Sequence, residues 1–321
     1  MKLGVFTVAL GDRSAEEAFR FLSERGVQTV EIGCGGYPGR AHCDPEVLLG
    51  DPAQLMAFQD LLARYDLTVS ALSVHSNHVH PNKAVRETAA GQFTLALRLA
   101  EKLGVDTVVT FSGCPGDHDG AKLPNWVTCA WPPDYGEVLR YQWDEVLIPF
   151  WKGAAAEAAK YGVTKIALEL HPGFCVYNAA TLLRLREAVG DAIGANFDPS
   201  HLFWQGTDPA RAILALKGAI YHFHAKDTNI NTYNTAVNGV LDTGGLLGLE
   251  ERSWLFRTVG YGHDALVWNN IVTALRLAGY DGAVSIEHED AFMSIEEGLD
   301  KGIRFLKDVL LYESPAEAWW A

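Results

Sequence analysis

Cysteine is sparse in this chain of 321 residues, and its five cysteines are scattered without a CxxC pair. An odd, dispersed set is typical of reduced thiols and excludes a disulfide framework as the source of stability. The opening run MKLGVFTVAL is followed at once by Asp12 and Arg13, with no cleavage-site pattern, so it resembles a first strand more than a signal peptide. We therefore expect a cytoplasmic protein.

Positive charge is also scarce, because 26 Lys and Arg face 40 Asp and Glu, for a net charge of −14. Nucleic-acid binding depends on clustered Lys and Arg, so this balance excludes a phosphate backbone as the main partner. No apolar run is long enough to span a bilayer, which excludes a membrane-embedded protein. A small neutral ligand or a cation remains as the expected partner.

Eight short apolar runs recur along the chain, and a helical pattern follows each one. Near-continuous apolar runs of this length are typical of parallel strands buried on both faces. The runs are LGVFTVAL, TVEIGC, TVSALSVH, TVVTFSG, KIALELHP, GANFDPSH, AIYHFHAKD and AVSIEHED. The helical patterns cover 15–25, 53–65, 85–103, 151–161, 180–189, 209–216, 265–278 and 295–311. Eight strand–helix units predict a (β/α)₈ TIM barrel as one domain over residues 1–321.

An open doubly wound sheet is the alternative, but no G-x-G-x-x-G follows the first strand. Two segments, at about 114–140 and 228–263, are too long to be simple connectors. Both follow strands, so we expect both over the C-terminal face of the barrel, where active sites of this fold lie.

Polar residues end four successive strands of the predicted barrel. Glu169 ends the fifth strand, Asp198 and His201 the sixth, His224 the seventh and Glu287 the eighth. Any one of these residues could be a hydrogen-bonded core residue or a helix-terminal charge. The agreement of four strands instead favours one shared site, since the strand ends converge at the same rim. Three carboxylates and one imidazole are a ligand set typical of Mn²⁺, Mg²⁺, Co²⁺ or Fe²⁺.

The chain resembles the sugar phosphate isomerase/epimerase family of xylose isomerase-like TIM barrels, which includes ketose 3-epimerases and inosose isomerases and dehydratases. The resemblance covers nearly the whole chain and is most specific in FDPSH, HAKD and SIEHED. It implies that Glu169, Asp198, His224 and Glu287 hold one divalent metal ion, with Mn²⁺ first and Zn²⁺ also open. It also implies that His201 contacts the substrate. Ketose epimerases usually carry an Arg after the metal-binding His, where this chain has Lys226.

Other residues near the rim are further candidates for substrate binding: His75, His171, Lys226 and, in the first long segment, Trp126. Trp126, Trp131, Phe174 and Trp204 could wall a sugar or be ordinary loop packing. Glu31, at the end of the second strand, could bind a ligand or orient a neighbouring group from a buried position.

These features predict a metal-dependent isomerase or epimerase of a keto sugar, in which Glu169 and Glu287 move protons through an enediolate. Elimination from a 3-keto-glycoside or inosose by a lyase or dehydratase is the alternative. Two other functions fit less well: an apurinic endonuclease and a non-catalytic sugar-binding protein. The first needs a ligand on strand four, where the sequence reads VTFSG. The assembly is left open, and a homo-oligomer is compatible with the tail AEAWWA, which carries Trp319 and Trp320.

Overall fold

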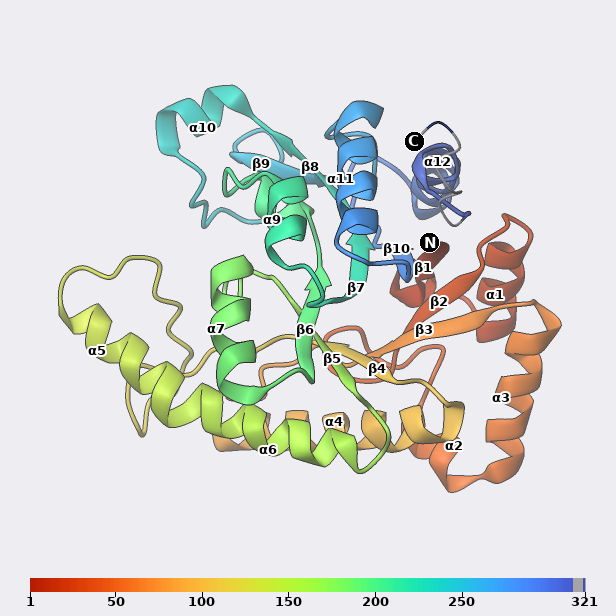
Figure 1. Cartoon of the computed structure of the whole chain (residues 1–321), viewed down its shortest axis with the longest axis horizontal. Coiled ribbons are helices and arrows are strands. Elements are labelled where there is room, and N and C mark those ends of the chain that lie inside the picture. The colour runs from red at the N-terminus through yellow and green to blue at the C-terminus, as the bar shows by residue number, and fades with distance from the viewer. Residues whose placement is uncertain (314–319, 321) are drawn as a thin grey trace.

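Eight short parallel strands close into a barrel in the spatial order β1-β10-β7-β6-β5-β4-β3-β2 (Figure 1). The strands are β1 (Lys2–Phe6), β2 (Thr29–Gly33), β3 (Thr68–Ser73), β4 (Thr107–Thr110), β5 (Lys165–Glu169), β6 (Ile193–Phe197), β7 (Ile220–Ala225) and β10 (Ala283–Ile286). Each coincides with one of the eight predicted runs, although β1 and β6 begin one residue before theirs, so the TIM-barrel prediction is confirmed. The computed structural model describes residues 1–313 and 320, so Trp319 lies outside the described residues.

The barrel strands are buried on both faces, as their apolar composition predicts. Every residue of β2, β4 and β6 is buried. One side of each strand packs against the surrounding helices, and the other fills the barrel interior. Near the amino-terminal end that interior is apolar, with Ala71, Val109 and Ala167 in contact. Farther along the strands it becomes polar, and the candidate site begins there.

Helices surround the barrel, and most of those outside the two long segments begin at a side-chain cap. Ser14 and Glu17 form a capping box at the first helix, and Asp208, Asp264 and Ser294 cap later ones. The helices outside the two long segments are α1 (Ala15–Ser23), α2 (Pro45–Gly50), α3 (Pro52–Arg64), α4 (Lys83–Leu103), α6 (Ile148–Ala159), α7 (Ala179–Val189), α8 (Ser200–Phe203), α9 (Pro209–Ala215), α11 (Ala265–Leu277) and α12 (Ile295–Val309). None of the described helices has the length and apolar character needed to cross a membrane.

The first long segment ends in a helix that the sequence pattern did not predict. α5 (Asp134–Arg140) continues through a π-helical stretch (Tyr141–Leu147) into α6, which makes the long rod at the lower left of Figure 1. We predicted this helix only from Trp151 onward. Proline is typical of a helix start, which favours a helix that begins near Pro149. In the structure Pro149 instead lies inside a continuous helical path.

The second long segment carries secondary structure of its own. It contains β8 (Asp227–Ile230), α10 (Thr232–Asn238) and β9 (Trp254–Arg257). β8 and β9 form a separate antiparallel pair outside the barrel, with Asp227 opposite Arg257. The pair and α10 lie together at the upper left of Figure 1, beside α9. The sequence predicted a long connection here but not this small sheet.

Candidate active site

Alternate residues of β6 and β7 line the barrel interior in two levels. Asn196 and His222 are partners in the strand register and make the deeper level. Asp198 and His224 come two residues later, so their side chains reach the same interior one step closer to the carboxyl ends. All four side chains are buried. The period of two that builds a strand therefore stacks one polar level on another.

The four predicted metal ligands come together in the upper level. One ligand atom from each of Glu169, Asp198, His224 and Glu287 lies within 4.8 Å of the other three. His224 Nδ1 is 3.1 Å from Glu287 Oε2 and 3.6 Å from Glu169 Oε2. Because β5, β6, β7 and β10 are consecutive in the barrel, folding alone collects these groups.

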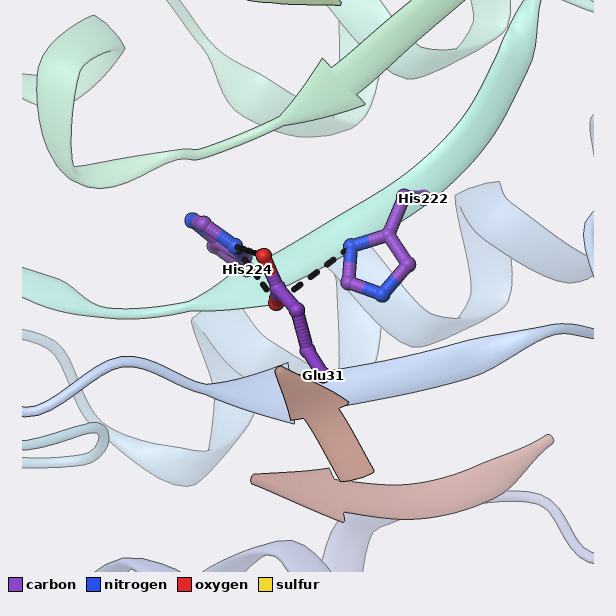
Figure 2. Close-up of side chains that lie close together, drawn as sticks. All are labelled: Glu31, His222 and His224. Carbon is purple, nitrogen blue, oxygen red and sulfur yellow. Dashed lines mark hydrogen bonds and ion pairs between the residues drawn. The ribbon is translucent and has the colours of Figure 1, made fainter. Parts of the chain in front are cut away.

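The second ring nitrogen of His224 faces away from that cluster and meets Glu31 (Figure 2). Nε2 lies 2.8 Å from one carboxylate oxygen of Glu31 and 3.0 Å from the other. Ser73 and Ser285 also donate hydrogen bonds to this carboxylate. Burial alone would raise the pKa of Glu31, but His224 and His222 outweigh it and lower the pKa to about 2. A carboxylate of this kind fixes which nitrogen of an imidazole faces a metal.

His222 belongs to the same buried network but carries no charge near pH 7. Its Nδ1 is 3.8 Å from Glu31 (Figure 2). The same nitrogen is 3.1 Å from the side-chain oxygen of Asn196, and Nε2 is 3.2 Å from Ser70 Oγ. Burial lowers its pKa to about 4, so the ring is neutral near pH 7. Glu31, His222 and His224 lie close enough to hold an ion. The polar atoms of Glu31 and His222 already have protein partners, so we assign these two residues the role of positioning His224.

Asp198 has an oxygen that the protein leaves without a hydrogen bond. Its Oδ1 accepts a hydrogen bond from the Ser200 backbone N–H at 2.8 Å. Its buried Oδ2 has no hydrogen-bond partner among the described residues, although Lys226 Nζ lies 3.1 Å away. Burial, with Glu287 and Glu169 nearby, raises the pKa of Asp198 to about 7 against the opposing effect of Lys226. Negative charge at this point is therefore incompletely balanced.

Lys226 supplies the buried positive charge beside the cluster. Its Nζ is 2.6 Å from Glu287 and 3.0 Å from Glu289. Burial would lower its pKa, but Asp198, Glu287 and Glu289 raise it well above the usual value, so the ammonium stays charged. One ammonium faces several carboxylates, and a divalent cation complements the remaining charge. The oxygen-rich donors, the Asp198 oxygen that lacks a hydrogen bond and the oriented His224 together fit a divalent metal ion.

The predicted substrate-binding residues lie around the cluster. His75 Nε2 is 2.8 Å and His201 Nε2 is 3.1 Å from Glu169, so both rings hold that carboxylate. Burial, together with His171 and Lys226, lowers the pKa of His201 to about 3. His75, His171 and Lys226 line a cavity of about 170 Å³ along with Glu169 and Glu287. His201 and Trp126 instead line a larger cavity next to it.

Some residues of the site were not predicted from the sequence. Asn196 donates to Glu169 at 3.4 Å, and His222 supports Asn196 from below. The available signal was the spacing of two residues from Asp198 and from His224. Trp131 differs from Trp126 and Trp204, because its side chain is 73% exposed and lines neither cavity. Our expectation that it walls a sugar is not supported by this position.

Comparison with known proteins gives a family and a shared fold. A family model described as a xylose isomerase-like TIM barrel matches residues 19–309. The chain is 37% identical over 97% of its length to the uncharacterized protein YfiH of Bacillus subtilis (strain 168), covering 99% of that protein.

Two solved structures share the fold at low identity. The probable 3-DHS dehydratase AsbF from Bacillus anthracis matches with a TM-score of 0.67 at 17% identity, over 96% of this chain and 99% of that one. The IOLI protein, solved with a bound zinc atom, matches with a TM-score of 0.67 at 18% identity, over 97% of this chain and 98% of that one.

Proposed function

Because the chain belongs to the xylose isomerase-like TIM-barrel family, we propose that it is a divalent-metal-dependent isomerase or epimerase of a keto sugar. One observation carries this proposal. Four consecutive barrel strands place one ligand atom each, from Glu169, Asp198, His224 and Glu287, within 4.8 Å of one another. The zinc found in a structure of the same fold is consistent with an ion here. We propose Mn²⁺ as the native ion, because three of the four donors are carboxylates.

A divalent ion in this position would polarise the carbonyl of a keto sugar and so acidify the neighbouring C–H bond. Glu169 and Glu287 are the two bases that this chain offers for that proton. They enter from β5 and after β10, which β7 and β6 separate in the barrel order. One carboxylate removes the proton to give an enediolate, and the other, once it has taken up a proton from solvent, delivers that proton from a different direction. Each such transfer contributes about 10²–10⁴-fold to the rate.

The two glutamates have different surroundings, which suits different roles. His75 and His201 hold Glu169, and burial keeps His201 neutral near pH 7. Lys226 and His224 hold Glu287, whose pKa lies well below the usual range despite burial. Glu287 therefore stays ionised beside a fixed ammonium, and Lys226 can donate a hydrogen bond to a substrate oxygen.

Elimination is the second candidate, and Lys226 is the observation that favours it. An ammonium 2.6 Å from Glu287 places a proton donor next to a base, as a lyase needs when a β-hydroxyl leaves. The dehydratase AsbF shares this fold. A lyase would take the same C–H proton and differ only in what leaves afterwards. In either case we propose a small sugar-like substrate and a cytoplasmic location.

Deuterium exchange in D₂O tests the proposed reaction. Manganese-loaded protein should introduce deuterium at the carbon next to the carbonyl of a ketohexose or a keto-inositol, as read by mass spectrometry. Glu169→Gln and Glu287→Gln keep the side-chain shape and remove one base each. Both variants should lose net turnover, and one of them should retain partial exchange. The exposed Glu24→Gln change is the control. Absence of exchange across this panel, or full turnover in both variants, would contradict the proposal.

A further inference from the structure

A second and larger cavity lies next to the polar one. It has a volume of about 500 Å³, which is within the range of about 300–1,000 Å³ found for small-molecule sites. The two long segments, the second of which includes β9, build most of its wall. Its apolar lining includes Trp126, Trp204, Val240, Leu241, Trp254 and Phe256. His171 lines both cavities, so the larger one opens beside the carboxylate cluster.

Aromatic stacking fixes one wall of this cavity. The rings of Trp204 and Trp254 are parallel within 2°, with centroids 4.8 Å apart. Phe256 lies 5.2 Å from Trp254, and the Trp254 indole donates to the Val240 carbonyl at 3.1 Å. Flat, immobile aromatic faces favour a planar apolar group over a flexible chain.

Two hydrogen-bond donors in this wall are unused. The indole N–H groups of Trp126 and Trp204 are buried and have no partner in the part of the chain that the structure describes. A buried donor left unpaired costs about 1–3 kcal/mol. Both residues line the cavity, but the surrounding protein covers these N–H groups, so what they offer a ligand is the apolar ring.

Two polar side chains of the lining, those of Asp242 and His201, are already engaged within the protein. Asp242 accepts backbone hydrogen bonds from Gly244 at 2.8 Å and Ser253 at 2.9 Å. His201 is held by Glu169 at 3.1 Å. A second sugar ring needs several free polar partners for its hydroxyls. This lining instead offers mainly apolar faces, which suits an aryl group better.

We propose that this cavity is a second compartment of the substrate site. It takes a planar apolar group, an aryl ring, attached to the polar group that the carboxylate cluster binds. The inference rests on the proposed function, since it names the class of substrate: a keto sugar that carries an aryl substituent. His171, which lines both cavities, would lie at the junction of the two parts.

Binding of 4-methylumbelliferone, a planar aryl lactone, tests the compartment by calorimetry at pH 6.5. The full-length protein should bind it, and Trp204→Leu should weaken binding at least 10-fold. Leu241→Asp is a second variant, because Leu241 is 63% exposed and the change spares the core. It should weaken binding to a similar degree. Trp131→Leu, which lies outside the lining, is the matched control and should stay within 2-fold.

Cellobiose serves as the competitor that represents a second sugar ring. It should not displace the bound coumarin. No binding of the coumarin, equal binding by all variants, or displacement by cellobiose would overturn the proposal. The readout is binding without chemistry, so the two proposals fail separately. Lost aryl binding with intact deuterium exchange counts against the compartment, and retained aryl binding with no exchange counts against the isomerase.

Discussion

His224 has carboxylate neighbours at both ring nitrogens, and this pairing decides how well it can bind a metal. Glu31 lies 2.8 Å from Nε2, while Nδ1 faces Glu169 and Glu287. A hydrogen bond from Nε2 to Glu31 leaves Nδ1 as the nitrogen with a lone pair for the ion. Glu31 is thus a positioning residue, which acts on a metal through the ring of His224.

Replacing Glu31 with Gln should weaken metal binding by about 10–100-fold, the usual effect of losing such an outer partner. The neutral amide accepts a weaker hydrogen bond and can also turn its N–H₂ toward the ring. Competition with a calibrated chelator measures the Mn²⁺ affinity. Glu24→Gln, at an exposed position, should bind Mn²⁺ as the parent protein does. Equal affinities in the two variants would remove Glu31 from this role.

His78 provides a pH-dependent contribution to stability away from the ligand cluster. Its Nε2 is 2.7 Å from Thr110 Oγ1, and its ring packs against Phe93, Phe150 and Trp151. Burial, with His75 nearby, lowers its pKa to about 3 from an ordinary value of about 6.5. Between those values the unfolded chain binds a proton that the folded one does not. Stability is therefore fully present above about pH 6.5 and falls as the pH drops toward 3.

Urea unfolding at pH 7, 5.5 and 4.5 should show this loss, and His78→Phe should reduce it. One proton taken up on unfolding corresponds to about 1.4 kcal/mol per pH unit. Phe fills the aromatic pocket without a titrating group, so the slope of stability against pH should fall by about that amount. His118→Phe, at a site 69% exposed, should keep the parent slope. A parent slope in His78→Phe would mean that the ring is protonated in the folded protein.

At the scale of elements, Asp227 holds the second long segment to the barrel. Its carboxylate accepts hydrogen bonds from the backbone N–H groups of Gly260, Gly262 and His263 and from the Trp268 indole. The backbone of Gly262 lies so close to β8 that a Cβ on this residue would lie 2.3 Å from the Thr228 carbonyl oxygen. The segment that walls the larger cavity is therefore tied at both ends to one buried carboxylate.

Asp227→Asn should loosen this segment while the barrel persists. The amide N–H₂ would face donors instead of accepting from them, at a cost of about 1–3 kcal/mol. Limited proteolysis should then cleave within residues 231–253 faster than in the parent protein. Asp264→Asn is the matched control, because Asn caps a helix about as well as Asp. Equal cleavage rates in the two variants would show that the segment is held elsewhere.

The sequence predicted the barrel strands well and the long segments poorly, for a physical reason. Apolar runs such as TVEIGC and KIALELHP are dictated by burial on both faces, and burial leaves a clear pattern in one dimension. β8 and β9 are short and half exposed, and they pair across an intervening stretch of 23 residues from Asn231 to Ser253. Nothing in the local pattern of either strand indicates its partner.

The same contrast holds for the site. Asp198, His224 and Glu287 were predicted because each follows a recognisable strand, and four strand ends converge in any such barrel. Glu31 and His224 are 193 residues apart, and only barrel closure brings them to 2.8 Å. Sequence position could suggest a buried role for Glu31 but not its partner. Candidate ligands at strand ends are thus more readily predicted than the residues that would position them.

For the whole molecule, Asp198 is the carboxylate at the carboxyl ends of the strands whose buried charge opposes folding unless a cation balances it. The chain carries a net charge of −14, and Asp198 is buried among like charges that raise its pKa. Lys226 offsets part of this repulsion. An ion that binds only the assembled barrel should offset the rest, because the unfolded chain separates the four ligands.

Added Mn²⁺ should therefore raise the melting temperature by several degrees. Binding to the folded state alone adds about 2.7 kcal/mol at an ion concentration 100 times the dissociation constant. Asp198→Ala should keep a folded barrel by circular dichroism yet lose the shift, because it removes one of the four ligands. Asp308→Ala, at an exposed position, should keep the full shift. Chelation with EDTA should return the parent protein to the melting temperature of its metal-free form. An equal Mn²⁺ shift in Asp198→Ala would contradict the role of Asp198 as a ligand of the ion.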